Sequence, residues 1–446
     1  PSDDTHGHSF VGGDVVHPTH APADIGGVAH ATAEGSAVEQ SPDHPGVEAT
    51  TGSPQSPIEY TPAPTGRLDG ATLSEREKLL QEVRVNLDHL PKPKNDSLQE
   101  PAVLSAADVG GVYRNPYPPM EQSARPCTDG RHTRGAWVFD AAKKPPYPSV
   151  GEILGSCQRG WEAKHGPGAV RPETQYRWVP DSCDLIPFSE EKFCKALRGR
   201  DIMFAGDSLN DHWHASLVYL LGLMRGNDIY RKEGTVQRKR ACQTHAICHR
   251  YYKRPLRLYF LTNQLLQQTS MRNRNHKWWK HIRQYSLLVL NAGSWMRDPT
   301  NEEREVSDSE YEGHIKHAAK LVRALFNGTV IWRTTYQGHP YCWKYDKPLT
   351  EELRAEDFPT VPPYKRYRWA AIPGRNRFAT RLWREAGAHI LDVTRPTNLM
   401  PLGHLGQNHP KFALRNTTDC LHYCAPGPYD TWSEMLMNLL LGNLGP

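Results

Sequence analysis

Hydrophobic and polar positions divide the chain into a polar N-terminal part and a long part in which short apolar runs alternate with helical repeats. Five short, largely apolar runs are typical of buried strands: 202–205, 257–261, 286–290, 329–332 and 389–393. Segments with apolar residues at helical spacing lie between or after them: 310–326, 375–385 and 431–441. This alternation of strands and helices predicts an α/β fold built on a parallel sheet.

The N-terminal part shows a different pattern. Residues 1–70 have no apolar period, and they carry ten Asp or Glu against one Arg. This composition predicts a disordered acidic stem. Residues 71–125 are predicted to hold an amphipathic helix over 74–90, which begins with a capping box, followed by a Pro-rich connector.

The stretch 204–209 reads Phe-Ala-Gly-Asp-Ser-Leu and places a serine where a predicted strand ends and a helix begins. Gly206 permits a sharp turn after the strand, and helical spacing resumes over 210–221. We therefore expect Ser208 at the carboxyl edge of the sheet, beside the free N–H groups of a helix start, which can stabilise an oxyanion. The alternative is that Ser208 only caps the helix.

A second informative stretch, 419–432, reads Asp-Cys-Leu-His-Tyr-Cys-Ala-Pro-Gly-Pro-Tyr-Asp-Thr-Trp. A nucleophilic serine needs a base to take its proton, and the base needs an acid to fix its tautomer. Asp419 and His422 are three residues apart, so one turn can place them side by side. With Ser208 they predict a catalytic Ser-His-Asp triad. His212 is nearer in sequence, but we expect its ring to point away from the attack face of the serine.

A serine early in a domain and an Asp-x-x-His near its end resemble the SGNH (GDSL-type) hydrolases. The fuller motifs, Phe-x-Gly-Asp-Ser-Leu and Asp-Cys-x-His-x-Cys-x-x-Gly-x-x-Asp-Thr-Trp, are similar to those of the plant trichome-birefringence-like / PC-esterase family of polysaccharide O-acetyltransferases. The resemblance extends from about Cys127 to Leu440. It implies a three-layer α/β/α sandwich of SGNH-hydrolase type over 190–446, beside a disulfide-stapled minor lobe over 126–189.

Further site residues follow other predicted strands. Asn291 follows the strand 286–290, where active-site residues of α/β proteins gather. It matches the Asn that donates to the oxyanion in SGNH proteins, a task it would share with the Ser208 N–H; a loop Asn closing a turn is the alternative. Gly234 is a weak counterpart of the usual glycine donor. The resemblance to an Arg-Thr-x-x-x-x-His segment implies that Arg333 and His339 line the cleft.

Nine cysteines and three N-glycosylation sequons favour an oxidising secretory lumen, either the Golgi or the cell exterior. The sequons begin at Asn95, Asn327 and Asn416. The resemblance implies the pairs Cys157–Cys424, Cys342–Cys420 and Cys127–Cys183. Cys242 and Cys248 are expected to form a local bridge, which leaves Cys194 as the free thiol. No run approaches the ~18 apolar residues of a membrane span, so membrane attachment is expected only through an N-terminal anchor that is not present in this sequence.

The net charge of +5 is unevenly distributed. Because residues 1–70 carry −9, the remainder carries +5 + 9 = +14. This excess suggests anionic partners, such as a uronate-bearing glycan or a phosphorylated acyl donor, but an ordinary charged surface is the favoured alternative. Two basic stretches cover residues 231–257 and 272–283, and the second includes Trp278 and Trp279, whose faces suit sugar rings. The alternative is that these stretches form a solvated surface. No nucleic acid is expected as a partner.

The predicted function is O-acetyl transfer to a hydroxyl of a cell-wall or secreted polysaccharide through an acetylated serine. The acetyl donor, acetyl-CoA or another acetyl carrier, is a co-substrate, and neither a metal nor a bound cofactor is expected. An acetylesterase with the same triad and a non-catalytic glycan-binding homologue are the alternatives. After the serine, the sequence Asn-Asp-His-Trp-His at 210–214 departs from the family's Ser-Arg-Asn-Gln-Trp, which leaves the acceptor open.

Overall fold

The computed structural model describes residues 126–127, 131–147, 154–223, 242–267, 277–297, 304–360, 364–408 and 419–443. The predicted acidic stem, the helix over 74–90, Gly234, and the sequons at Asn95 and Asn416 lie outside the described residues.

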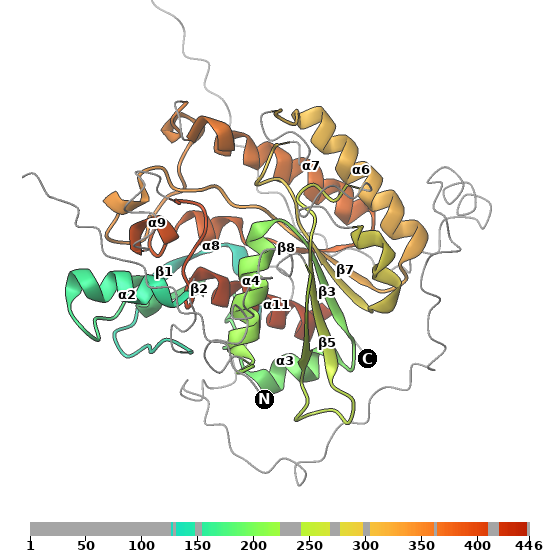
Figure 1. Ribbon diagram of the computed structural model, residues 1–446, viewed down its shortest axis with the longest axis horizontal. Helices are drawn as coiled ribbons and strands as arrows, with labels where there is room; N and C mark the ends of the chain where they lie inside the picture. The colour runs from blue at the N-terminus through green and yellow to red at the C-terminus, as the bar shows by residue number, and fades with distance from the viewer. Residues whose placement is uncertain are drawn as a thin grey trace, which may run out of the picture. The chain divides into compact units, whose positions relative to one another are not determined.

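A six-stranded sheet with the order β4-β5-β3-β6-β7-β8 forms the centre of the described part (Figure 1). The strands are β3 (Ile202–Gly206), β4 (Cys242–Ile247), β5 (Leu256–Thr262), β6 (Leu287–Leu290), β7 (Thr329–Arg333) and β8 (His389–Leu391). All neighbours are parallel except β4, which runs antiparallel to β5 at one edge. Every residue of β3 and β6 is buried, as expected of central parallel strands covered on both faces.

Helices cover both faces of this sheet. Along β3, Ile202 and Phe204 belong to the core shared with one set of helices, whereas Met203 and Ala205 belong to the core shared with the other. The first set is α3 (Glu190–Leu197), α4 (Ser208–Leu220) and α11 (Pro428–Asn443), and the second is α6 (Asp308–Leu325) and α7 (Ile372–Glu385). Figure 1 shows α6 and α7 together on one side of the sheet. This arrangement confirms the predicted three-layer α/β/α sandwich.

The segment that precedes the sandwich, called here the minor lobe (described residues within 126–189), holds a two-stranded antiparallel sheet and a helix. Its elements are β1 (Gly135–Phe139), α2 (Leu154–His165) and β2 (Tyr176–Pro180). The side chain of Trp178 in β2 is buried, and its indole N–H donates to the His132 carbonyl at 2.7 Å. Two short helices, α8 (Thr394–Asn398) and α9 (Leu405–Asn408), follow β8. Among the described helices, none combines the length and apolarity that spanning a membrane requires.

Four disulfides join described residues: Cys127–Cys183, Cys157–Cys424, Cys342–Cys420 and Cys194–Cys248. The first three pairs are those that the family resemblance implied. The expected Cys242–Cys248 bridge, with Cys194 free, is wrong. The strand β4 begins at Cys242 and ends just before Cys248. An extended strand rises ~3.3 Å per residue, so these two cysteines are separated by about 20 Å, far beyond disulfide reach.

The tryptophans of the second basic stretch are also placed differently from expectation. Trp278 is fully buried and Trp279 nearly so, both in the core beneath α6. Their faces are therefore not available for stacking on a sugar ring.

Candidate active site

Ser208 is the first residue of α4 and lies directly after the turn that ends β3. The helix is capped by Asp207, whose Oδ1 accepts a hydrogen bond from the Leu209 N–H at 3.0 Å. The alternative in which Ser208 serves only as the cap is therefore wrong. At Gly206, an added Cβ would approach Oδ1 of Asn291 to 1.9 Å, so only glycine fits here without displacing that side chain.

Three side chains form a hydrogen-bonded chain at the carboxyl edge of the sheet. Ser208 Oγ lies 2.7 Å from His422 Nε2, and His422 Nδ1 lies 2.7 Å from Asp419 Oδ2. The other carboxylate oxygen, Asp419 Oδ1, accepts from the backbone N–H groups of Leu421 and His422 at 3.0 and 2.9 Å. About one fifth of the side chains of His422 and Asp419 is exposed, so the chain of hydrogen bonds reaches the surface.

The electrostatics of this chain match the roles of base and acid. Burial raises the pKa of Asp419, but the His422 ring and the two backbone N–H donors lower it more, and the carboxyl stays ionised. Burial lowers the pKa of His422, but the Asp419 carboxylate, with Asp207 and Asp211 nearby, raises it above its ordinary value. With Asp419 ionised, Nδ1 of His422 is held as the N–H donor, which leaves Nε2 of the neutral ring free to accept the serine proton.

His212 lies closer to the site than expected. Its ring centroid is 4.7 Å from that of His422, with the two planes inclined by 31°. It therefore packs against the proposed base, on the same helix as Ser208. Sequence spacing alone did not predict this contact.

His339, expected to line the cleft, is buried in a pair with His404. His339 Nδ1 lies 2.8 Å from His404 Nε2, and His339 Nε2 lies 2.7 Å from the Asn398 carbonyl. Two neutral rings supply one N–H to each of these contacts. Burial lowers the pKa of His339 to about 4 and that of His404 well below its usual value, so the pair is neutral at pH 7. The prediction that His339 lines the cleft is wrong; the pair lies behind the backbone of His422, with His404 Nδ1 3.2 Å from its carbonyl oxygen.

Arg333 is fully buried as well, so its predicted place in the cleft lining is also wrong. Its Nε donates to Asn210 Oδ1 at 2.9 Å, and its Nη2 lies 3.8 Å from Asp207 Oδ1. The guanidinium also lies over the ring of Trp432, 4.9 Å from its centroid. Arg333 therefore supports the first turn of the serine helix from inside the core. The resemblance to an Arg-Thr-x-x-x-x-His segment does not show burial, which is why it suggested a place in the cleft for both residues.

Asn291 lies beside the serine turn, as its position after β6 predicts. Its side chain is fully buried and lies against the Cα of Gly206, two residues before Ser208. Neither its amide nitrogen nor its oxygen has a hydrogen-bond partner among the residues that the structure describes. An unsatisfied buried amide costs stability and therefore calls for a functional explanation.

A family model matches residues 185–439, a segment that includes the serine, the histidine and the aspartate of this chain of hydrogen bonds. The model is PC-Esterase, the GDSL/SGNH-like acyl-esterase family found in Pmr5 and Cas1p. The chain belongs to this family.

Individual relatives match this chain at low sequence identity. Xyloglucan O-acetyltransferase 1 of Arabidopsis thaliana is 24% identical over 360 residues, which cover 69% of this chain and 80% of that protein. Protein trichome birefringence-like 39 of the same plant is 26% identical, over 70% of this chain and 86% of its own length. Among solved structures, the acetylxylan esterase Axe2 from Geobacillus stearothermophilus is 12% identical, with a TM-score of 0.31, over 54% of this chain and 94% of that chain.

In this member of the PC-Esterase family, the loop that carries Asp419 and His422 is fixed on both sides. Cys420 is bonded to Cys342, and Cys424 is bonded to Cys157 in α2 of the minor lobe. Backbone hydrogen bonds pair the loop with residues 403–406: Cys424 N to Gly403 O, Leu405 N to His422 O and Gly406 N to Asp419 O, each at 2.8–2.9 Å. A base that must stay within hydrogen-bonding distance of the serine needs such support.

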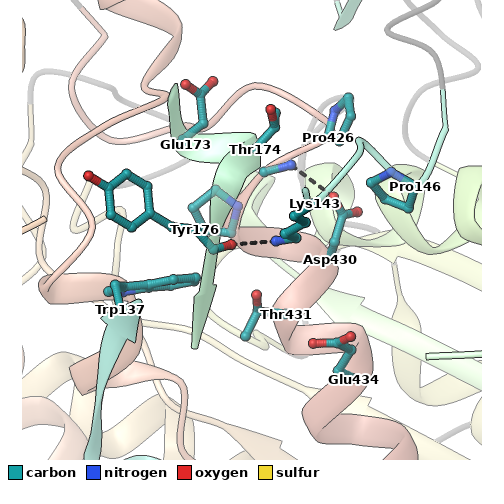
Figure 2. A pocket seen from close by; sticks show the side chains of 12 residues that line it. Trp137, Lys143, Pro146, Glu173, Thr174, Tyr176, Pro426, Asp430, Thr431 and Glu434 are labelled. Atoms are coloured by element: carbon teal, nitrogen blue, oxygen red, sulfur yellow. Dashed lines mark hydrogen bonds between the residues drawn. The ribbon is translucent and has the colours of Figure 1, made fainter. Parts of the chain in front are cut away.

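Just after this loop, the minor lobe meets the start of α11 around a small pocket of about 20 Å³ (Figure 2). Lys143 donates to the Tyr176 carbonyl there, beside Asp430 and Glu434. Asp430 accepts from the Gly427 N–H at 2.8 Å and from the hydroxyl of Tyr147 at 2.6 Å. Burial lowers the pKa of Lys143 and raises the pKa of Asp430 and of Glu434. The pocket is a polar junction between the minor lobe and the end of the loop.

Across the described ranges, no three His, Cys, Asp or Glu side chains are grouped to hold a metal ion.

Proposed function

We propose that this protein transfers an acetyl group from a donor, through Ser208, to a hydroxyl of a polysaccharide. The observation that carries the proposal is the Ser208–His422–Asp419 hydrogen-bond chain in a member of the PC-Esterase family. Relatives named as xyloglucan O-acetyltransferases support polysaccharide as the acceptor class. The complete chain of hydrogen bonds argues against a non-catalytic glycan-binding protein.

In the first half-reaction, Ser208 Oγ attacks the acetyl carbonyl carbon while its proton passes to His422 Nε2. The tetrahedral intermediate collapses as the bond to the donor's leaving group breaks, and that group takes the proton from Nε2. In the second half-reaction, a sugar hydroxyl gives its proton to His422 Nε2 and attacks the acetyl-serine. Ser208 then leaves with that proton, and the acetyl ester stays on the sugar. Asp419 holds the His422 tautomer throughout.

The oxyanion would be bound by the Ser208 backbone N–H at the start of α4 and by the side-chain amide of Asn291. The unpartnered Asn291 amide beside Gly206 supports this role. Loss of one such donor typically lowers kcat by about 10²–10³-fold. We therefore expect that much loss of kcat in Asn291→Ala, with the thermal stability unchanged or raised because an unsatisfied buried group is removed. A loss of stability without loss of kcat would assign Asn291 a structural role.

An esterase would use the same residues with water in place of the sugar, so the experiment must separate the second half-reactions. The protein is incubated with an acetyl donor, with and without a polysaccharide, and acetate release and polysaccharide acetylation are both measured. Transfer predicts acetylated polysaccharide and a lower yield of free acetate when the acceptor is present. Free acetate that is independent of the acceptor would identify an esterase.

We also infer that the protein works in an oxidising secretory lumen, either in the Golgi or outside the cell. The four disulfides span 54, 56, 78 and 267 residues. They lie within or between the proposed minor lobe (126–189) and the proposed catalytic domain (190–446). Such bridges persist where glutathione does not keep thiols reduced. Stability in a reducing buffer equal to that in an oxidising one would contradict this assignment.

A further inference from the structure

An open groove of about 520 Å³ lies where α7 and the start of α8 meet residues 133–134 of the minor lobe. Two of its residues, Thr334 and Asp392, directly follow β7 and β8. The groove is therefore at the same carboxyl edge of the sheet as Ser208, which follows β3. Two strand spacings separate β3 from β7 and three separate it from β8, a distance on the order of 10–14 Å.

The groove has a row of exposed arginines on one helix. Arg377, Arg381 and Arg384 line it, and their spacing of four and three residues places them on one face of α7. Arg134 of the minor lobe is a fourth exposed arginine in the lining. Within the described ranges, none of these four has an acidic side chain within ion-pair distance. Like charges at this spacing repel one another, so the row destabilises the helix unless an anion binds it.

The acidic residues of the groove are already engaged. Glu352 pairs with the fifth arginine, Arg395, at 3.3 Å and accepts from the amide of Asn398 at 2.7 Å. Asp392 accepts from the hydroxyl of Thr334 at 2.9 Å and from the Thr394 N–H at 3.0 Å. Five arginines in the lining face only these two carboxylates, so the groove keeps an excess of positive charge.

We propose that this groove binds the carboxylates of an acidic polysaccharide, such as a galacturonate polymer, and so selects the acceptor for Ser208. The proposal rests on the proposed function and deepens it, because it names an anionic acceptor, whereas some relatives are named as xyloglucan O-acetyltransferases. Successive arginines rise about 4.5–6 Å along the helix, comparable to the length of one sugar unit. Each guanidinium can bind a carboxylate with two parallel hydrogen bonds.

A phosphorylated acetyl donor carries its charge at one end, and binding it requires several donors that converge on one point. The arginine row is instead spread along a helix and open to solvent, with the partly exposed, hydroxyl-bearing side chains of Thr380 and Thr394 in the same lining. That arrangement suits a polymer with one charge and several hydroxyls per unit. Its distance from β3 leaves room for a few sugar units between the bound carboxylates and the serine.

The test measures binding of a galacturonate oligomer by calorimetry to the full chain carrying Ser208→Ala, so that no turnover occurs and the result does not depend on acetyl transfer. The neutral probe is the same oligomer with its carboxyls reduced to alcohols. The groove variant is Arg377→Ala/Arg381→Ala/Arg384→Ala. The charge-matched control is Lys192→Ala/Lys320→Ala/Arg323→Ala, three exposed cations on α3 and α6.

We expect the acidic oligomer to bind more tightly than the neutral one and to weaken as salt is added. The groove variant should lose about tenfold in affinity and most of the salt dependence, whereas the control keeps both. Arg381→Lys, which keeps the charge, should lose less than Arg381→Ala. Equal binding of the two oligomers, or equal losses in the groove and control variants, would overturn the proposal. So would a groove variant that loses affinity for acetyl-CoA but not for the galacturonate oligomer, since the groove would then serve the donor.

Discussion

Oγ of Ser208 lies 2.7 Å from Nε2 of His422, although 214 residues separate them in sequence. The serine is placed by the turn from β3 into α4, and the histidine by a loop that two disulfides fix. Two independent structural elements thus meet at one hydrogen bond, which makes the contribution of each testable.

The first prediction concerns the three residues of the hydrogen-bond chain. Ser208→Ala and His422→Ala should each lower kcat for acetyl transfer by at least ~10³-fold, and the double variant should lose little more, because the residues act as a unit. Asp419→Asn should also lower kcat strongly, because an amide no longer holds the correct His422 tautomer. Circular dichroism of each variant checks folding. Full transfer by folded Ser208→Ala would exclude the acetyl-serine route.

The second prediction concerns pH. His422 must be neutral to accept a proton, and its pKa lies above the ordinary value, chiefly because the Asp419 carboxylate outweighs burial. Activity should therefore fall as the pH decreases through a midpoint above about 6.5. Asp419→Asn removes the main cause of the upward shift, so the residual activity should show a lower midpoint. A pH–rate profile with the same midpoint in both proteins would contradict the assignment of His422 and Asp419.

The third prediction concerns the packing of Gly206 against Asn291. Gly206→Ala should lower the free energy of unfolding by about 1–3 kcal/mol, because the new Cβ would meet the Asn291 amide at 1.9 Å. Adding Asn291→Ala should recover part of that loss, a coupling that a double-mutant cycle by urea denaturation measures. Gly313→Ala on α6 is the control: nothing lies within 4 Å, and the change should stabilise the helix by about 0.5–1 kcal/mol. Simple additivity of Gly206→Ala and Asn291→Ala would show that the two sites are independent.

The fourth prediction separates two disulfides of similar span. In the chain-entropy model, Cys342–Cys420 and Cys194–Cys248, which span 78 and 54 residues, each stabilise the fold by about 4 kcal/mol. Replacing either pair by Ala should therefore lower the melting temperature to a similar extent. Only loss of the Cys342–Cys420 bridge, next to Asp419, should also lower kcat under conditions where the protein remains folded. Equal effects on kcat would mean that the bridge does not position the loop.

Sequence reasoning predicted the sheet, its helices and the meeting of Ser208 with Asp419 and His422, because local apolar patterns and two compact motifs carry that information. It did not predict β4, because the polar residues of this edge strand lack a buried-strand pattern. Because the strand was missed, Cys248 was paired with Cys242 instead of Cys194. It placed Arg333 and His339 in the cleft because their segment resembles an Arg-Thr-x-x-x-x-His motif, and that resemblance does not show whether a side chain is buried. Their actual partners, Asp207, Asn210 and His404, come from distant segments that only the folded structure brings together.

The central claim is that Ser208 carries the acetyl group between donor and polysaccharide. Its most direct test is peptide mass spectrometry of the protein after brief incubation with an acetyl donor and no acceptor. We predict one acetyl group on the peptide that contains Ser208, removed on addition of polysaccharide as the acetyl group appears on the sugar. An actively transferring protein that never carries acetyl on Ser208 would contradict the account.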